Sequence, residues 1–499
     1  MKRIISAAAA AVMLTGCAAG DGSSAENSSA AKTAEKTELV WMTGADMPYQ
    51  DDLNDYLASA GYNFHIKLKT ITNDFESIFD GKGKLTEDFW TGCYRAELIA
   101  ALDEGADSID TSCWFENSYL SYAEKGLLEP LGQYLESERG EELYSYFPRK
   151  YWQNLTYNSE IYGVDSWLNC LQSDISFYFN SEIAADMTVE DLGGDCFSAL
   201  DKAAELCREN GAMFVIQSLD ALANWVDYDF VTSCIYIDDS GRTANIYESE
   251  FAEKLFEKIA KYYNSGEFVN DVEVGSKLPD EVLGETHSTV AAECYNGFMT
   301  SEDFGISTMV DNFGTLRLAN SAHTKLTANV PVTGIYSGSE NKEQAFEAIC
   351  AFMCDSEFIN TLNYGAGYTE TDGCASYSEY CGIPMGNVAE MLPIEGMSPA
   401  NIGKKKKDSL AGKQVSRYSE FSFNAENVQK EIIDIYNLTL NINDDFLKRK
   451  TDDTENAAIS AKEYLDELNA SLYAADLQDV LDEVDRQLEE YNETHDTDN

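Results

Sequence analysis

The chain has 499 residues, with 88 Asp and Glu against 35 Lys and Arg, and a formal net charge of −53. This balance excludes nucleic acid as a partner and favours a neutral or cationic ligand, although such acidity also serves simply to solvate a protein surface. A hydrophobic content of 44% with 12% aromatic residues excludes a disordered chain, and the length predicts two or more domains. We expect the basic run Lys404–Lys407 to be a solvated loop.

Residues 1–17 have the pattern of a bacterial secretory signal. Met1-Lys2-Arg3 precedes an apolar run that is shorter than the roughly 20 residues needed to span a membrane. The run ends in Leu14-Thr15-Gly16-Cys17, which resembles the lipobox of bacterial lipoproteins, where the cysteine thiol is acylated. The sequence therefore predicts a signal peptide over 1–16 and a chain tethered by lipid at Cys17 to the outer face of the cytoplasmic membrane. The alternative is an ordinary signal peptide that happens to end in cysteine.

Residues 17–37 are mostly small and polar, and we interpret them as a flexible tether. Hydrophobic periodicity then predicts alternating strands and helices. Strands are expected at 39–43, 64–69 and 108–113, and helices at 48–61, 94–104 and 118–125. This alternation predicts a mainly parallel sheet covered by helices. Ligands bind such sheets beyond the carboxyl ends of the strands, which directs attention to the loops at Thr43 and Trp114.

A second α/β region follows in the sequence. Strands are expected at 175–180 and 213–216, and helices at 198–210 and 251–263. A helix pair rich in Ala, Phe and Met is expected at 342–362. The last long element, 454–491, is strongly helical with a break near 471–475.

Eleven cysteines remain after Cys17, and an odd number cannot all pair. Cys207, Cys234 and Cys350 stand where a small apolar residue would serve, so we expect mostly buried free thiols. Cys374 and Cys381 would be the first choice for a disulfide. The pattern contains no CxxC or HExxH motif, and we predict no metal, no cofactor and no catalytic residue.

Several short motifs occur in the order typical of one family. They are Ala123-Glu-Lys-Gly126 before Leu-Leu-Glu-Pro-Leu, Ser159-Glu-Ile-Tyr-Gly-Val164, Phe177-Tyr-Phe-Asn180, Val290 to Gly297, Thr333 to Phe352, and the tail Leu472 to Leu488. Together they resemble the extracellular solute-binding proteins of ABC importers, family 1, typified by maltose-binding protein. The tail is similar to that of the lipid-anchored oligosaccharide binders. Two positions depart from the pattern: Asp165 replaces a Pro, and Ala475-Asp476 replaces a Gly.

The resemblance implies an α/β, two-lobe periplasmic-binding-protein-like fold of type II, with a ligand cleft between the lobes and a helical C-terminal extension. We assign 38–172 to the first part of lobe 1, 173–287 to the first part of lobe 2, 288–330 to a return to lobe 1, and 331–452 to a return to lobe 2 with loops. Residues 453–499 form the C-terminal helices. The implied protein is a monomer that captures a small solute, with an oligosaccharide as first choice, and delivers it to the permease subunits.

The resemblance also suggests ligand contacts. Trp114 takes the place of a sugar-stacking tryptophan and Asn117 matches a polar position, although Trp114 also suits a core and Asn117 a helix N-cap. Asp46 would accept sugar hydroxyls or act as a loop cap. The complete set of candidate ligand-binding residues is Thr43, Asp46, Trp114, Asn117, Trp167, Trp225, Tyr295, Asn296 and Phe298.

Two alternatives stay open at this stage. A lipid-anchored glycoside hydrolase needs only two suitably placed carboxylates, and 88 acidic residues do not exclude such a pair. A peptide or amino-acid receptor on the same fold is the other alternative. We expect a binding protein rather than an enzyme.

Overall fold

The computed structural model divides the chain after Lys36 into two units, and the structure described below belongs to the second, Thr37–Asn499. The signal peptide, Cys17 and the expected tether up to residue 35 lie outside the described residues, and Thr37, the last residue of that tether, is the first residue of β1. The structure describes residues 36–43, 48–70, 80, 84–86, 105–111, 118–166, 175–180, 188–211, 213–216, 229–238, 240–270, 290–296, 313–318, 323–324, 332–377, 385–387, 389–392, 410, 413–440, 442, 445–447 and 460–495.

The first sheet has the strand order β2-β1-β3-β16-β6. Strands β2, β1 and β3 are parallel to one another, whereas β16 runs antiparallel to both β3 and β6. Phe64 and Ile66 are buried while His65 and Lys67, which alternate with them, are not, which is the pattern of a strand with one covered face. The strands are β1 (Thr37–Thr43), β2 (Phe64–Thr70), β3 (Ser108–Thr111), β6 (Gly163–Val164) and β16 (Val332–Ile335).

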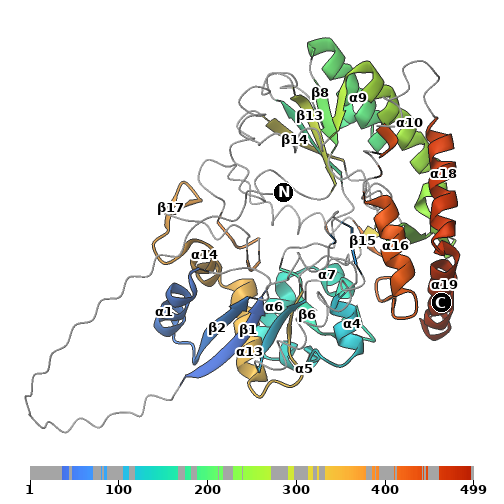
Figure 1. The fold of residues 1–499 in the computed structure, drawn as a ribbon. Helices are drawn as coiled ribbons and strands as arrows, with labels where there is room; N and C mark the ends of the chain where they lie inside the picture. The colour runs from blue at the N-terminus through green and yellow to red at the C-terminus, as the bar shows by residue number, and fades with distance from the viewer. Residues whose placement is uncertain are drawn as a thin grey trace, which may run out of the picture. The chain divides into compact units, whose positions relative to one another are not determined.

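Helix α13 (Lys342–Cys354) packs on this sheet and is apolar on almost every side (Figure 1). Its Phe352 ring lies 4.9 Å from that of Trp41 on β1, and such all-round burial is typical of a core helix. The other helices of this half are α1 (Gln50–Ala60), α4 (Ser118–Glu124), α5 (Gly132–Leu135), α6 (Glu138–Tyr146), α7 (Arg149–Asn154) and α14 (Ser356–Tyr364). Two hairpins complete it, β4 (Thr156–Tyr157) with β5 (Glu160–Ile161), and β17 (Thr369–Thr371) with β18 (Cys374–Ser376).

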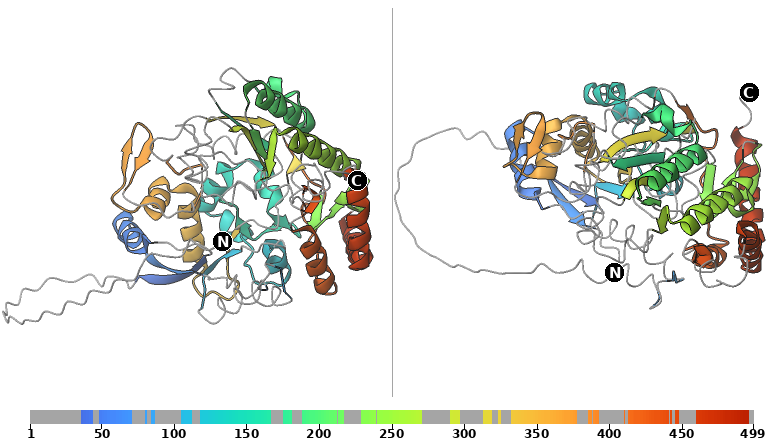
Figure 2. Two further views of the ribbon diagram at one scale, coloured as in Figure 1. Left: turned by 45° about the horizontal axis from the view of Figure 1, so that its top comes forward. Right: turned by 90° about the horizontal axis from the view of Figure 1, so that it is seen from above.

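The second sheet has the order β12-β8-β13-β7-β14. Strands β12, β8 and β13 are parallel, and β7 runs antiparallel to β13 and to β14. Helices α9 and α10 lie against it (Figure 2). The strands are β7 (Ile175–Asn180), β8 (Met213–Ile216), β12 (Phe268–Asn270), β13 (Val290–Asn296) and β14 (Phe313–Leu318).

Three helices of the second half begin at side-chain caps. Asp195 caps α9, Ser249 caps α10, and Ser460 forms a capping box with Glu463 at the start of α18. The helices are α9 (Cys196–Asn210), α10 (Glu250–Ser265), α16 (Gln429–Thr439), α18 (Ala461–Ala474) and α19 (Leu477–His495), with short 3-10 turns η2 (Val189–Leu192) and η4 (Ile246–Glu248). A small sheet of β9 (Asp229–Thr232), β10 (Ile235–Ile237) and β11 (Thr243–Asn245) packs beside them.

Two large hydrophobic cores are separate from each other. One surrounds the first sheet, α13 and α14, and the other joins α9, α10, α16, α18 and α19. We call these halves lobe 1 and lobe 2. The fold class expected from the sequence, two α/β lobes with C-terminal helices, is confirmed.

Two domain assignments made from the sequence are wrong. Strands β13 and β14 pair within the lobe 2 sheet, so 288–330 does not return to lobe 1 over these strands. Strand β16 pairs with β3, and α13 and α14 build the lobe 1 core, so this part of 331–452 belongs to lobe 1. The apolar strand Val290–Asn296 would suit either sheet, because the residues of a strand do not by themselves determine which strand it pairs with.

The described residues place three passages of the chain between the lobes. Val164 ends β6 in lobe 1 and Ile175 begins β7 in lobe 2, while Leu318 ends β14 in lobe 2 and Val332 begins β16 in lobe 1. The third passage leads from Leu410, in the lobe 1 core, to Tyr418, in the lobe 2 core. Within the second and third passages, β15 (His323–Thr324) pairs with β19 (Gln414–Val415).

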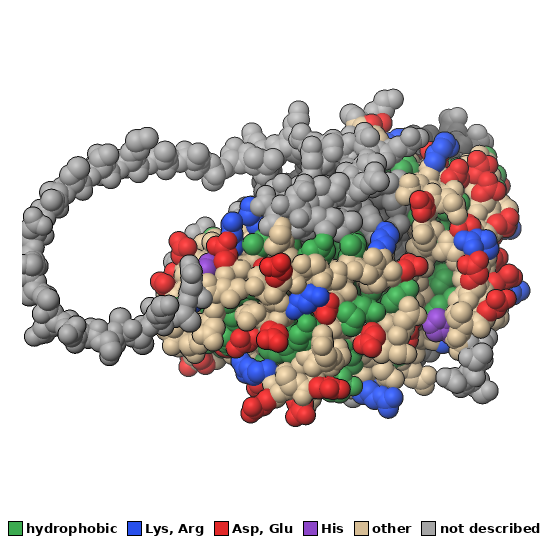
Figure 3. All heavy atoms as spheres, turned by 90° about the horizontal axis from the view of Figure 1, so that it is seen from below, with side chains coloured by type: hydrophobic (Ala, Val, Ile, Leu, Met, Phe, Trp, Pro, Cys, Tyr) green, Lys and Arg blue, Asp and Glu red, His purple; other side chains and the backbone are tan. Residues whose placement is uncertain are grey.

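Carboxylates are scattered over the face seen in Figure 3, with Lys and Arg side chains between them. This distribution fits a solvated acidic surface. Among the described residues, no helix has the length and apolarity needed to cross a membrane. The described part of the chain likewise contains no group of three or more potential metal ligands. Six of its cysteines are free thiols, including Cys374, while Cys381, the partner suggested for Cys374, lies outside the described residues.

Candidate functional site

Four strand ends lie together at one edge of the lobe 1 sheet. Thr43 and Thr111 are the last residues of the parallel strands β1 and β3. Val332, the first residue of β16, is the partner of Thr111, and Val164 at the end of β6 is the partner of Thr333. This edge is where α/β sheets bind ligands.

Three sequence-predicted residues follow these ends closely. Asp46, Trp114 and Trp167 each come three residues after a strand end, at Thr43, Thr111 and Val164 respectively. The strand topology therefore starts these three loops at one edge of the sheet, two of which, at Thr43 and Trp114, were expected from the sequence. The three side chains themselves lie outside the described residues, as does Asn117.

The lobe 2 sheet has a corresponding edge. Strand β8 ends at Ile216 and the parallel strand β13 at Asn296, whose partner Ile175 begins β7. Tyr295 and Asn296 are the last two residues of β13, which places their backbone at this edge. Trp225 and Phe298 follow β8 and β13 in the sequence and lie outside the described residues.

Two passages between the lobes join these two edges. Residues 165–174 lead from the end of β6 to the start of β7, and residues 319–331 lead from the end of β14 to the start of β16. Leu318, at the end of β14, pairs with Ile175 at the same lobe 2 edge. The predicted residues therefore follow the same sheet edges from which the chain passes to the other lobe.

Thr43 is the predicted site residue whose side chain the structure describes. Its side chain is fully buried at the end of β1, with an exposed fraction of 0%. Asp107 is buried too, but it precedes β3 at the opposite end of that strand from Thr111, and its carboxylate accepts hydrogen bonds from Val40 N–H, from the Ser339 hydroxyl and from the Asn341 amide. The burial of Thr43 gives no support to a ligand contact through its side chain.

The first passage begins at a fixed point that the sequence analysis missed. The buried hydroxyl of Tyr151 accepts a hydrogen bond from Asp165 N–H at 2.8 Å and lies 3.1 Å from the Asp165 carbonyl oxygen, to which it donates. A Pro at position 165 would have no N–H to donate. The Asp that departs from the family pattern thus makes a contact the usual residue cannot make. Nothing in the local pattern around Tyr151 marks this role.

Close backbone packing also explains the glycine before this passage. A Cβ atom on Gly163 would lie 2.7 Å from the carbonyl oxygen of Thr333 on β16. Gly163 and Val164 pair with β16, so any larger residue would push the two strands apart. The motif Tyr162-Gly163-Val164 is therefore required by strand packing as well as resembling the family.

Solved structures of similar fold were found by comparison of the whole chain. The N-glycan transport solute binding protein NgtS from Streptococcus pneumoniae aligns with a TM-score of 0.63 and 18% identity, covering 91% of this chain and 99% of that one. An extracellular solute-binding protein of family 1 from Alicyclobacillus acidocaldarius aligns with a TM-score of 0.51 and 12% identity, covering 88% and 98%. The chain has the two-lobe fold of the extracellular solute-binding proteins.

The resemblance expected from the sequence motifs is confirmed at the level of this solute-binding fold. The GacH receptor of Streptomyces glaucescens also aligns, with a TM-score of 0.50 and 14% identity, covering 89% of this chain and 98% of that receptor. No curated protein sequence matches the chain significantly. Residues 417–493 match a family described as a domain of unknown function, DUF3502.

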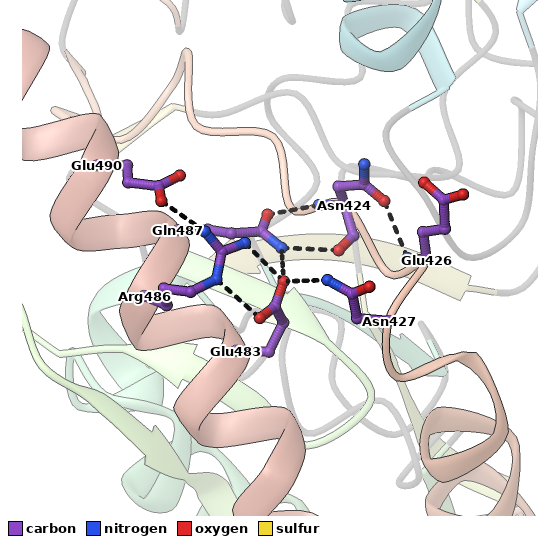
Figure 4. A network of polar contacts seen from close by, with 7 residues as sticks. All are labelled: Asn424, Glu426, Asn427, Glu483, Arg486, Gln487 and Glu490. Atoms are coloured by element: carbon purple, nitrogen blue, oxygen red, sulfur yellow. Dashed lines mark hydrogen bonds and ion pairs between the residues drawn. The ribbon is translucent and has the colours of Figure 1, made fainter.

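In the solute-binding fold of this chain, the matched segment 417–493 is part of lobe 2. We call it the C-terminal module. Its helices α16, α18 and α19 supply much of the lobe 2 core, and α19 holds the loop before α16 through side chains (Figure 4). Gln487 bonds both N–H and C=O of Asn424, and Glu483 accepts from Arg486, Gln487 and Asn427. Arg486 lowers the pKa of Glu483 to about 2, with further help from the Gln487 and Asn427 amides.

Proposed function

We propose that this protein is the substrate-binding lipoprotein of an ABC importer and that it captures an oligosaccharide between its lobes for delivery to the permease. The observation that carries the proposal is the pair of separate cores whose sheets meet the crossing segments at the edges bearing the candidate residues. The fold of the N-glycan transport protein supports it. That protein has been crystallised with Man1GlcNAc and with Man5GlcNAc.

Capture would work by selecting the closed arrangement of the lobes. A sugar bound at the lobe 1 edge gains contacts to the lobe 2 edge only when the lobes approach, so the ligand shifts the equilibrium toward closure. The permease then recognises the closed form. The protein needs no catalytic group for this cycle.

The candidate residues have the chemistry that sugars require. Trp114, Trp167 and Trp225 would stack on the apolar faces of sugar rings, and each stacked, buried ring is worth about 1–3 kcal/mol. Asp46 and Asn117 would bond the hydroxyls. Tyr295, Asn296 and Phe298 would supply the lobe 2 side of the same site, and Thr43 would support it from β1.

A binding screen against a panel of ligands tests this function. Maltooligosaccharides, mannose–GlcNAc oligosaccharides, peptides and amino acids are each added and the melting temperature is recorded. A ligand at 100 times its dissociation constant adds about 2.7 kcal/mol of stability, which produces a clear upward shift. We expect a sugar to give this shift and Trp114→Ala to abolish it, while Trp114→Phe, which keeps a ring, retains part of it.

Two results would overturn the proposal. A shift given by peptides or amino acids but by no sugar would indicate the receptor of a different solute class. The second result is the appearance of shortened sugars after incubation with the protein. Chromatography would detect them, and they would identify a glycoside hydrolase.

Cys17 would anchor the protein at the outer face of the cytoplasmic membrane. Two or three acyl chains hold a folded body at a bilayer because each buried methylene contributes about 0.8 kcal/mol. In detergent phase separation, the wild type is expected in the detergent phase and Cys17→Ser in the aqueous phase. Recovery of the Cys17→Ser protein in the detergent phase would refute the anchor.

A further inference from the structure

The C-terminal module contacts lobe 1 through a side-chain amide that pairs with a backbone. Asn437 on α16 accepts from Leu85 N–H and donates to Leu85 C=O, each at 2.9 Å. Leu85 lies in the segment between β2 and β3, so both ends of its segment belong to the lobe 1 sheet. The two bonds therefore tie that sheet to a helix of the lobe 2 core.

The same geometry is used elsewhere in the chain to hold a segment in place. Asn54 on α1 bonds both N–H and C=O of Ile66 on β2, at 2.7 and 2.8 Å. Asn363 on α14 does the same with Met385. Both of these pairs lie within lobe 1, whereas the Asn437 pair joins the two lobes.

A second contact from the module reaches lobe 1 at a hairpin turn. Glu420 accepts a hydrogen bond from Asn158 N–H at 2.9 Å. Asn158 and Ser159 both have positive φ, 48° and 66°, which forms the tight turn between β4 and β5 and presents this N–H. The turn containing Glu420 is held on α19, because Tyr491 donates to the carbonyl oxygen of Arg417 at 3.1 Å.

In addition to burial, the charge of Glu420 raises the pKa of one tyrosine in each lobe. The pKa of Tyr491 in lobe 2 is raised, first by burial and then by Glu420. The pKa of Tyr157 in lobe 1 is also raised, first by burial, then by Glu124, with a smaller part from Glu420. This carboxylate thus lies where the two lobes meet.

We propose that the C-terminal module latches lobe 1 through Glu420 and Asn437 and so sets the balance between lobe arrangements before any ligand binds. Lys150 on α7 adds a hydrogen bond to the carbonyl oxygen of Lys413 beside the third passage, outside the module. The latch gives the segment of unknown function a role in tuning affinity at a distance from the ligand. It rests on the proposed function only in requiring lobes that move.

The test uses the full chain without ligand, so its outcome does not depend on the identity of the solute. Small-angle X-ray scattering is measured for wild type, for the double variant Glu420→Ala with Asn437→Ala, and for a matched control. The control, Glu426→Ala with Asn492→Ala, removes the same two residue types from the same module at positions outside the latch. Hydrogen exchange of peptides covering Leu85 and Asn158 is followed in parallel.

We expect the latch variant to change the radius of gyration beyond replicate scatter and the control to superpose on wild type. Loss of the hydrogen bonds that the Leu85 and Asn158 N–H groups donate should speed exchange at these two amides by about tenfold. Glu420→Gln keeps an acceptor oxygen and should behave like wild type. A folded latch variant, shown by an unchanged circular dichroism spectrum, with wild-type scattering would overturn the proposal.

Discussion

Tyr151 joins two elements through a single hydroxyl. It lies on α7, and it binds the backbone of Asp165, where the chain leaves the lobe 1 sheet. Both residues are 1% exposed, so water cannot replace either bond. Tyr119 acts in a similar way, accepting from Tyr162 N–H while donating to the carbonyl oxygen of Leu155.

Tyr151→Phe is expected to destabilise the protein. The substitution leaves the buried N–H of Asp165 without this acceptor, and a buried unsatisfied donor costs about 1–3 kcal/mol. Urea unfolding followed by tryptophan fluorescence measures the loss. Tyr144→Phe is the matched control, since Tyr144 is 44% exposed, and its effect should stay within about 0.5 kcal/mol. Equal stability of the two variants would contradict this account.

The two departures from the family pattern have local physical reasons. Asp165 replaces a Pro and uses its N–H, as described above. Asp476 stands in the segment where the family has Gly and adopts a φ of 61°, a left-handed conformation that Asp tolerates better than most residues. Both departures could be seen in the sequence. How the fold accommodates them became clear only from the positions of Tyr151 and of the break between α18 and α19.

At the scale of elements, α19 holds the loop before α16 by a charged network. Glu483 receives hydrogen bonds from Arg486, Gln487 and Asn427, and these favour its ionised form. Its folded pKa of about 2 lies below the ordinary value of 4.5. A depressed carboxyl pKa contributes stability that is present above the unfolded pKa and is lost as the pH falls through the folded pKa.

The network should therefore weaken in acid. The stability advantage of wild type over Glu483→Gln is expected to be constant above about pH 4.5 and to shrink between that pH and about pH 2. Urea unfolding at a series of pH values measures the difference. Glu489→Gln, an exposed position on the same helix, serves as the control. An advantage that stays the same down to pH 2 would show that the network does not hold the loop.

The sequence predicted most of these elements because their periodicity is strong. The strand and helix around Thr43 and Gln50, the helix pair after Lys342 and the break near residue 475 all occur as expected. Sheet partners could not be predicted in the same way. The sheets that β13 and β16 join are decided by pairing with strands far away in the sequence. For this reason the sequence analysis assigned each of these two strands to the wrong lobe.

At the scale of the whole molecule, the two cores should respond separately to mutation. Leu57 is fully buried in the lobe 1 core and Leu200 in the lobe 2 core. Each Leu→Ala change is expected to cost about 2–5 kcal/mol in its own lobe. Calorimetry should show Leu57→Ala lowering one thermal transition and Leu200→Ala the other. One shared transition, lowered equally by both variants, would show that the lobes unfold as a unit.

The candidate site also belongs to this scale. The expected strand ends predicted where the loops with Asp46 and Trp114 would lie, and the sheet order agrees with that arrangement. The burial of Thr43 and the contacts of Glu420 and Asn437 could not be read from the pattern. The contacts of Glu420 and Asn437 arise where segments more than 200 residues apart in sequence pack together.

Three passages between lobes have a consequence for synthesis of the chain. Lobe 1 is incomplete until α13 and α14 have emerged, and lobe 2 until the residues up to Leu488 have joined its core. Neither half can finish folding while the ribosome is still producing the middle of the polypeptide. A nascent chain stopped near residue 450 would expose unfinished apolar surface, which makes such truncated products targets for chaperones and proteases.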